Sequence, residues 1–279
     1  MIQGPLELLA SAFLHASWNA LLERERHPQG AVLAVLTAAL VFAAAAALAF
    51  PGAGFPTRAG LLWTAAAGVF EGVYFLTLAA ALGRATYGAV YAVARGGALL
   101  VVWPAAALWL HEPVPARAVA GAVLVGVGVA AVAATGREHA SRAGMAFAVA
   151  CAAAIGGYHL CYDRALREGA SPAPVFAVAL AVALPLAWAA ARRASNVAAP
   201  GSRSDVLRRV AAGALATASF LLFLHGLSRS GAGVALTLRN TSVVFAQLLA
   251  VLLGERVPAR QWAGAALVAL GAAVLTPPG

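Results

Sequence analysis

Three charged side chains stand in the middle of long apolar stretches of the sequence: Glu71, Arg95 and Arg239. A charge at the centre of a membrane helix disfavours insertion by roughly 2.5–3.5 kcal/mol, so a charge in this place indicates a functional site. A guanidinium group stays charged and presents a planar fork of donors that suits carboxylate and phosphate oxygens. We therefore interpret Arg95 and Arg239 as ligands of an anionic group, with Glu71 as their counter-charge. The alternative is that one arginine pairs with Glu71 and only ties two helices together.

Polar and aromatic residues surround these charges at helical spacing. Tyr87, Tyr91 and Arg95 are four residues apart and share one face of a helix. The stretch after Arg239 contains several polar residues, so we expect it to avoid lipid. The predicted lining of a central cavity is completed by the polar or aromatic residues Trp18, Asn19, Tyr91, Asn240 and Gln247.

Histidines are a second group of candidates. His15 lies near the middle of the first apolar run and shares a face with Trp18 and Asn19, so it is a candidate proton relay or a neutral packing residue. His159 and His225 fall near predicted helix ends and are expected at the membrane interface. The two cysteines, Cys151 and Cys161, have no metal-binding spacing. We expect no metal, no cofactor and no catalytic residue.

The elements that hold these residues follow from composition. Of the 279 residues, 62% are hydrophobic and 10% are charged, and the mean hydropathy is +0.85. Soluble domains are about 45–50% apolar and about 25% charged, so a cytosolic enzyme, a disordered chain and a disulfide scaffold are excluded. The net charge of +9 comes from arginines dispersed between apolar runs. This pattern is typical of charges that flank membrane spans, and we expect no nucleic-acid partner.

Apolar runs predict an all-α polytopic membrane protein with ten transmembrane helices, since a span needs about 20 residues. The runs are continuous rather than alternating, which excludes a β-barrel. The predicted spans are 5–22, 31–50, 60–82, 86–110, 116–135, 143–162, 172–191, 210–228, 231–253 and 260–276. The longest predicted loop is 192–209.

An internal repeat divides these ten spans into two halves. The tetrapeptide VPAR at 114–117 recurs at 257–260, and each copy follows a glutamate, Glu112 or Glu255. These glutamates are expected to cap turns or to pair with Arg117 and Arg260. Further matches are Gly68 with Gly213, Phe75 with Phe220, Arg84 with Arg229, and Trp18 with Tyr158. Since five helices is an odd number, the second half must enter the bilayer inverted, and a site is expected at the midplane between the halves. The predicted repeats are 1–135 and 143–279, joined by 136–142.

The sequence resembles the EamA family of the drug/metabolite transporter superfamily over essentially its whole length. The resemblance rests on HEPVPARAVAGAVLVGVGVAA in the first half, GERVPARQWAGAALVALGAAV in the second, and HASWNALLERERHP near the N-terminus. His111 stands where the family usually has glycine before the glutamate. The resemblance implies a transporter of small metabolites, favours export, and implies that both termini lie in the cytoplasm. The arginine distribution opposes this orientation, because five loop arginines would then lie inside and twelve outside.

We therefore expect an integral membrane permease that moves a small polar metabolite, which can be anionic, by alternating access, driven by a secondary gradient or by exchange. Glu71 and His15 are the candidates for proton coupling. One alternative is a transporter of neutral or cationic solutes, such as amino acids or drugs, in which Glu71 is the key residue. Another is a non-transporting sensor or assembly factor. We expect a multi-pass protein of the inner or plasma membrane, as a monomer or a homodimer. No P-loop or catalytic motif indicates an enzyme.

Overall fold

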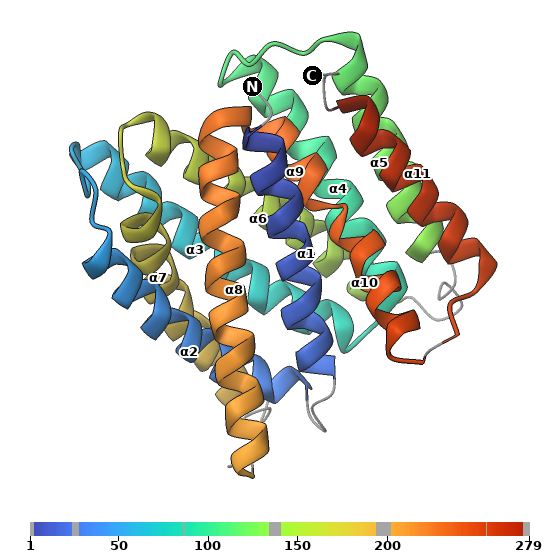
Figure 1. Cartoon of the computed structure of the whole chain (residues 1–279), viewed down its shortest axis with the longest axis horizontal. Coiled ribbons are helices and arrows are strands. Elements are labelled where there is room, and N and C mark those ends of the chain that lie inside the picture. The colour runs from blue at the N-terminus through green and yellow to red at the C-terminus, as the bar shows by residue number, and fades with distance from the viewer. Residues whose placement is uncertain are drawn as a thin grey trace.

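The computed structural model describes residues 3–23, 28–85, 87–133, 141–193, 202–254 and 256–275. These residues form an all-α fold whose two chain ends lie on the same face of the molecule (Figure 1). The helices are α1 (Gln3–Glu23), α2 (Pro28–Ala49), α3 (Arg58–Leu82), α4 (Tyr87–Leu108), α5 (Ala116–Ala133), α6 (Arg142–Arg167), α7 (Pro172–Arg193), α8 (Arg203–Ser230), α9 (Ala232–Arg239), α10 (Ser242–Leu252) and α11 (Ala259–Leu275).

Most predicted spans match one helix each, but the structure differs in two places. The predicted span 231–253 is two helices, α9 and α10, because the chain breaks at Asn240 and Thr241. The helix α8 begins at Arg203, well inside the predicted loop 192–209. A capping box explains this early start, since Ser202 and Asp205 satisfy each other's backbone N–H groups at the first turn.

The chain is a multi-pass membrane protein. By length and composition, six segments of the described residues can cross a membrane: Ala31–Ala49, Arg58–Leu82, Arg142–Arg167, Pro172–Ala189, Arg203–Ser230 and Ala232–Leu252, the last of which includes the break. Shorter apolar helices cover Val93–Leu108, Ala116–Val132 and Ala259–Leu275. The fold is therefore the polytopic helical architecture expected from the sequence.

The contacts between helices stay the same when each helix is replaced by its counterpart in the other half. The helix α3 packs on α6 and α7, and correspondingly α8 packs on α1 and α2. The helix α4 packs on α5 and α6, and its counterparts α9 and α10 pack on α11 and α1. Two further pairs, α5 with α11 and α2 with α7, join equivalent helices across the molecule. The core therefore lies between the halves and not within either one.

Glycines allow the closest of these approaches. A Cβ atom at Gly128 would lie 2.6 Å from the carbonyl oxygen of Gly264, and one at Gly264 would lie 2.7 Å from that of Gly128. The same reciprocal contact joins Gly121 and Gly271, at 2.8 and 2.7 Å. Neither position has room for a side chain, because the opposing atom is backbone. The pair α5–α11 thus packs through small residues, as is common in membranes.

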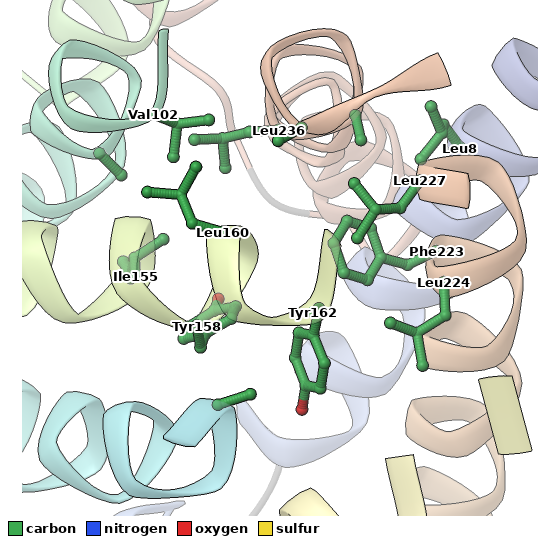
Figure 2. Packing of buried hydrophobic residues seen from close by; sticks show 14 of the residues in the cluster. Leu8, Val102, Ile155, Tyr158, Leu160, Tyr162, Phe223, Leu224, Leu227 and Leu236 are labelled. Atoms are coloured by element: carbon green, nitrogen blue, oxygen red, sulfur yellow. The ribbon is translucent and has the colours of Figure 1, made fainter. Parts of the chain in front are cut away.

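The largest buried cluster surrounds α6. Figure 2 shows Ile155 and Leu160 of α6 near Val102 of α4, with Phe223 of α8 close to Tyr162. Aromatic rings continue this cluster, since Phe220 stacks on Phe176 at 4.5 Å between ring centroids and meets Phe223 edge-on at 5.9 Å. The rings of Phe220 and Phe223 lie beside the buried Arg239.

Candidate functional site

The break between α9 and α10 places Arg239 at the end of a short helix inside the protein. Hydrogen bonds across the break have i to i−3 spacing, since the Thr241 N–H donates to Leu238 O at 3.0 Å and the Val243 N–H donates to Asn240 O at 3.2 Å. The Thr241 hydroxyl also donates to Leu238 O, at 2.7 Å. Discontinuous helices of this kind line substrate sites in transporters with inverted repeats.

The guanidinium group of Arg239 is buried, with 2% of the residue exposed. Its Nη1 donates to Ser11 Oγ of α1 at 3.2 Å. The rings of Phe220 and Phe223 lie 4.5 and 4.4 Å from the guanidinium carbon, so the cation faces two aromatic surfaces. Among the described residues, no carboxylate forms an ion pair with Arg239. A buried cation with this surrounding has capacity to bind an anion.

Arg95 occupies the equivalent place in the first half, within the continuous helix α4. It is 9% exposed, and its Nη2 lies 2.7 Å from His15 Nε2 of α1. Its guanidinium carbon lies 5.6 Å from the centre of the Tyr91 ring. The Trp18 indole N–H donates to His15 Nδ1 at 3.3 Å. The structure therefore brings together His15 and Trp18 of α1 with Tyr91 and Arg95 of α4. The spacing in the sequence predicted each of these two faces but not the contact between them.

Glu71 lies on the face of α3 that packs against α6 and α7, and it is 3% exposed. Gly68 and Gly72 flank it on the same face, so α7 approaches closely on either side. The charge of Glu71 interacts with Arg239, and Tyr162 lies next to it. Within the described part of the chain, Glu71 forms no ion pair with either arginine. The alternative to an anion site, an ion pair between Glu71 and one arginine that only ties two helices together, is therefore not formed.

Several other buried polar side chains lack a partner in the structure. Among the described residues these include both amide atoms of Asn240, both amide atoms of Gln247 and Ser242 Oγ. Buried polar groups are normally hydrogen-bonded, so this set is available to a bound solute or to water. Asn19 differs from them, because its amide nitrogen donates to the carbonyl oxygen of His15, 2.7 Å away. The side chain of Tyr87 lies outside the residues that the structure describes.

Residues around Arg239 were missed in the sequence. Ser11, Phe220 and Phe223 come from α1 and α8, and nothing in their local spacing relates them to an arginine in α9. The expectation that His159 is interfacial is wrong, because α6 continues to Arg167 and buries this residue completely. The His159 ring lies close to Ile155 O, 2.8 Å from Nδ1, and Tyr158 stacks on it at 4.5 Å between ring centroids. His225 is exposed on α8.

Glu112 agrees with one of its two predicted roles, since it acts as a cap, but it has a different ionic partner. It pairs with Arg167 of α6 at 2.7 Å and not with Arg117. Its carboxylate accepts the backbone N–H groups of Ala232 and Gly233 at 2.9 and 3.4 Å, so it caps α9 from the other half of the chain. Arg117 and Glu112 both line a cavity of about 370 Å³. Glu255, its counterpart, lies outside the described residues.

Comparison with known proteins agrees with this architecture. Residues 142–276, from the start of α6 to the end of α11, match the EamA-like transporter family. The chain carries an EamA-like transporter domain. This family is part of the drug/metabolite transporter superfamily, and it is a family of transporters and not of enzymes. Membrane transport of a small molecule is the general function that this domain's family implies.

The whole chain, and not only the EamA-like domain, has a counterpart among solved structures. A protein known from its crystal structure aligns with a TM-score of 0.76, covering 98% of this chain and 95% of that chain, at 22% sequence identity. At this identity the likeness shows the fold alone, and it includes the first half as well as the domain. No curated protein matches the sequence.

Proposed function

We propose that this EamA-like chain is a permease that exports a small polar metabolite with an anionic group across the inner or plasma membrane. The buried Arg239 carries this proposal, because its guanidinium group contacts one hydroxyl group and two aromatic rings and forms no ion pair among the described residues. Arg95 stands at the equivalent place in the first half. An anion between the two would gain charge-assisted hydrogen bonds in a medium of low dielectric constant.

Alternating access is proposed to occur between the predicted repeats, 1–135 and 143–279. The exchange symmetry of the helix contacts supports this, because the core that must rearrange lies between the halves. Asn240, Gln247, Tyr91 and Trp18 are proposed to contact the polar part of the solute. Asn19 is proposed to act at the edge of the site, since its amide is used by the backbone of α1.

Of the two coupling candidates, the surroundings favour Glu71 over His15. Both ring nitrogens of His15 face donors, the Trp18 indole N–H and the Arg95 guanidinium. A neutral imidazole accepts at one nitrogen only and an imidazolium at neither, so a second proton on His15 is disfavoured. Glu71 is buried and forms no ion pair among the described residues, and such a carboxylate can exchange a proton when the site opens.

A neutral or cationic solute is the second candidate. It is favoured by one observation, that Glu71 takes part in no ion pair among the described residues. In that case Glu71 would bind the solute, and the arginines would hold the helices. The two candidates differ in which variant loses binding, since Arg239→Gln removes an anion site and Glu71→Gln removes a cation site.

A ligand-stability screen on the purified protein tests the proposal. The panel contains small carboxylates, phosphate, phosphonates, neutral amino acids and amines. We expect stabilisation by one or more anions in the wild type, loss of this stabilisation in Arg239→Gln, and retention in Arg229→Gln, which removes an arginine at the protein surface. Stabilisation by amines alone, lost in Glu71→Gln, would support the second candidate. Uptake of the stabilising compound by proteoliposomes then separates transport from a sensor role.

A further inference from the structure

Glu112 connects the first half of the chain to the start of α9. Its side chain is 11% exposed and lies where the α4–α5 connection meets the α8–α9 turn. Besides the backbone N–H groups of Ala232 and Gly233, the carboxylate contacts Arg167, which also pairs with Asp163. The α9 N-terminus has no side-chain cap from its own residues, because Gly231 precedes it. The carboxylate therefore supplies the cap and faces the positive end of the helix.

The backbone at Gly231 is adapted to this contact. Its φ angle is +80°, a conformation that suits glycine. A Cβ atom there would lie 2.7 Å from Glu112 Oε1. The turn before α9 therefore leaves space for a carboxylate that belongs to the other half of the chain.

A second residue of the first half holds α9 along its length. The Trp103 indole N–H of α4 donates to Thr237 Oγ1 at 3.1 Å, and the Trp103 ring packs on Gly233, where a Cβ atom would lie 2.9 Å from it. The helix has only eight residues and is about 12 Å long. Its last residue is Arg239. A displacement at the capped end must therefore reach the guanidinium group.

We propose that Glu112 is a positioning residue that fixes α9 to the first half and thereby places Arg239 in the central site. The proposal rests on the proposed function, since the value of a fixed Arg239 lies in the solute that it binds. Release of the cap lets α9 move with Arg239 and opens the cavity beside Glu112, which is lined by Val234, Ser230 and Arg167. Thus one ionic contact couples access at this face to the geometry of the site.

The test measures the exposure of α9 without any substrate. A reporter cysteine replaces Val234 in a background with both native cysteines changed to alanine, and a membrane-impermeant maleimide labels it in proteoliposomes. We expect Glu112→Gln to raise the labelling rate about tenfold, because a neutral amide caps more weakly than a carboxylate and loses the pairing with Arg167. Glu112→Asp, which keeps the charge, should restore part of the protection. The matched control is Glu168→Gln, since Glu168 lies on the same face and accepts from Thr57 Oγ1.

A second reporter separates a local effect from general loosening. Val35→Cys is buried on α2 against α8, and its labelling should stay unchanged in Glu112→Gln. Unchanged labelling at Val234→Cys in Glu112→Gln, or an equal rise at both reporters, would overturn the proposal. If Glu112→Gln does not fold, the same comparison is made with Glu112→Asp, for which no rise at all is the contrary result.

The link to Arg239 has its own measurement. For any anion that stabilises the wild type in the screen, Glu112→Gln should raise the apparent Kd about tenfold, whereas Glu168→Gln should leave it unchanged. An unchanged Kd together with faster labelling would refute the coupling to the site. If no anion binds but the labelling result holds, the proposed function fails while the fixation of α9 by Glu112 stands.

Discussion

Arg95 and Arg239 stand at equivalent places of the two halves, but their backbones differ. Arg95 is followed by Gly96 and Gly97 within the continuous helix α4, whereas Arg239 is followed by Asn240 and Thr241, where the helix breaks. At Asn240 and Thr241 the backbone keeps right-handed helical angles, but hydrogen bonds of i to i−3 spacing interrupt the regular ladder. Arg95 has no helix end beside it and lies against His15.

This difference makes the proposed site asymmetric, although the contacts between helices are similar in the two predicted repeats. The two halves make equivalent contacts between helices, so both arginines lie in the interior. The side chains around them are not repeated, because Arg239 meets Ser11 and two phenylalanine rings while Arg95 meets an imidazole and a phenol. A solute bound between them would therefore be held in one orientation.

The strongest test concerns the places where the halves should behave alike. Gly128→Val and Gly264→Val should each destabilise the protein by about 3 kcal/mol, because the new side chain meets a backbone carbonyl that cannot move aside. The measurement is unfolding by SDS titration in mixed micelles. Since the contact is reciprocal, the two losses should be equal. A large loss in one variant and none in the other would show that α5 and α11 are not packed as described.

The next test concerns the place where the halves should differ. We expect Arg239→Gln to weaken binding of a stabilising anion about a hundredfold and Arg95→Gln about tenfold, within the range for charge-assisted hydrogen bonds. The larger effect is expected at Arg239 because it is the more buried of the two, at 2% exposed against 9% for Arg95. Kd values from thermal-shift titration give the ranking. The reverse order would assign the leading role to the continuous helix.

A smaller effect tests the space beside each arginine. In α4, a Cβ atom at Gly97 would lie 2.9 Å from Ala152 Cβ, whereas one at Gly96 has no neighbour within 4 Å. Gly97→Thr, which introduces the second-half residue, should therefore cost about 1–2 kcal/mol by overpacking. Gly96→Asn should be nearly neutral. The same SDS titration distinguishes them, and equal costs would mean that α4 and α6 are less tightly packed.

The smallest effects lie at the surface. Arg229 pairs with Glu7, while its counterpart Arg84 lies over the Phe147 ring, 5.2 Å from its centre. Each contact should contribute about 0.5 kcal/mol, measured by replacing either arginine with glutamine. Only the first should fade in high salt, because exposed ion pairs are screened. A salt dependence in Arg84→Gln as large as that in Arg229→Gln would contradict the assignment.

The helices could be predicted because a bilayer demands continuous apolar runs, and the burial of Glu71, Arg95 and Arg239 followed from the same demand. The break after Arg239 could not, because Asn240 and Thr241 also fit a polar face of an unbroken helix. Ser202 and Asp205 mark the start of α8 in the sequence, but the span was predicted from the apolar run, which begins later.

The residues around the buried charges could not be predicted from local sequence patterns. Phe220 and Phe223 have the spacing of an ordinary packing face, and only the folded chain brings them to Arg239. Likewise, Glu112 was expected to cap a turn or to pair with Arg117, and its actual partners, Arg167 and the α9 N-terminus, are distant in sequence. Contacts that cross between the halves are those that sequence spacing does not reveal.

The glycine contacts between α5 and α11 also constrain how the two halves can diverge. If the halves arose by duplication of one ancestral segment, most positions could change in one copy without consequence for the other. Gly121 lies against Gly271 and Gly128 lies against Gly264, so a larger residue at any of these positions is opposed by the backbone of the other half. At these four positions, therefore, both halves must retain glycine.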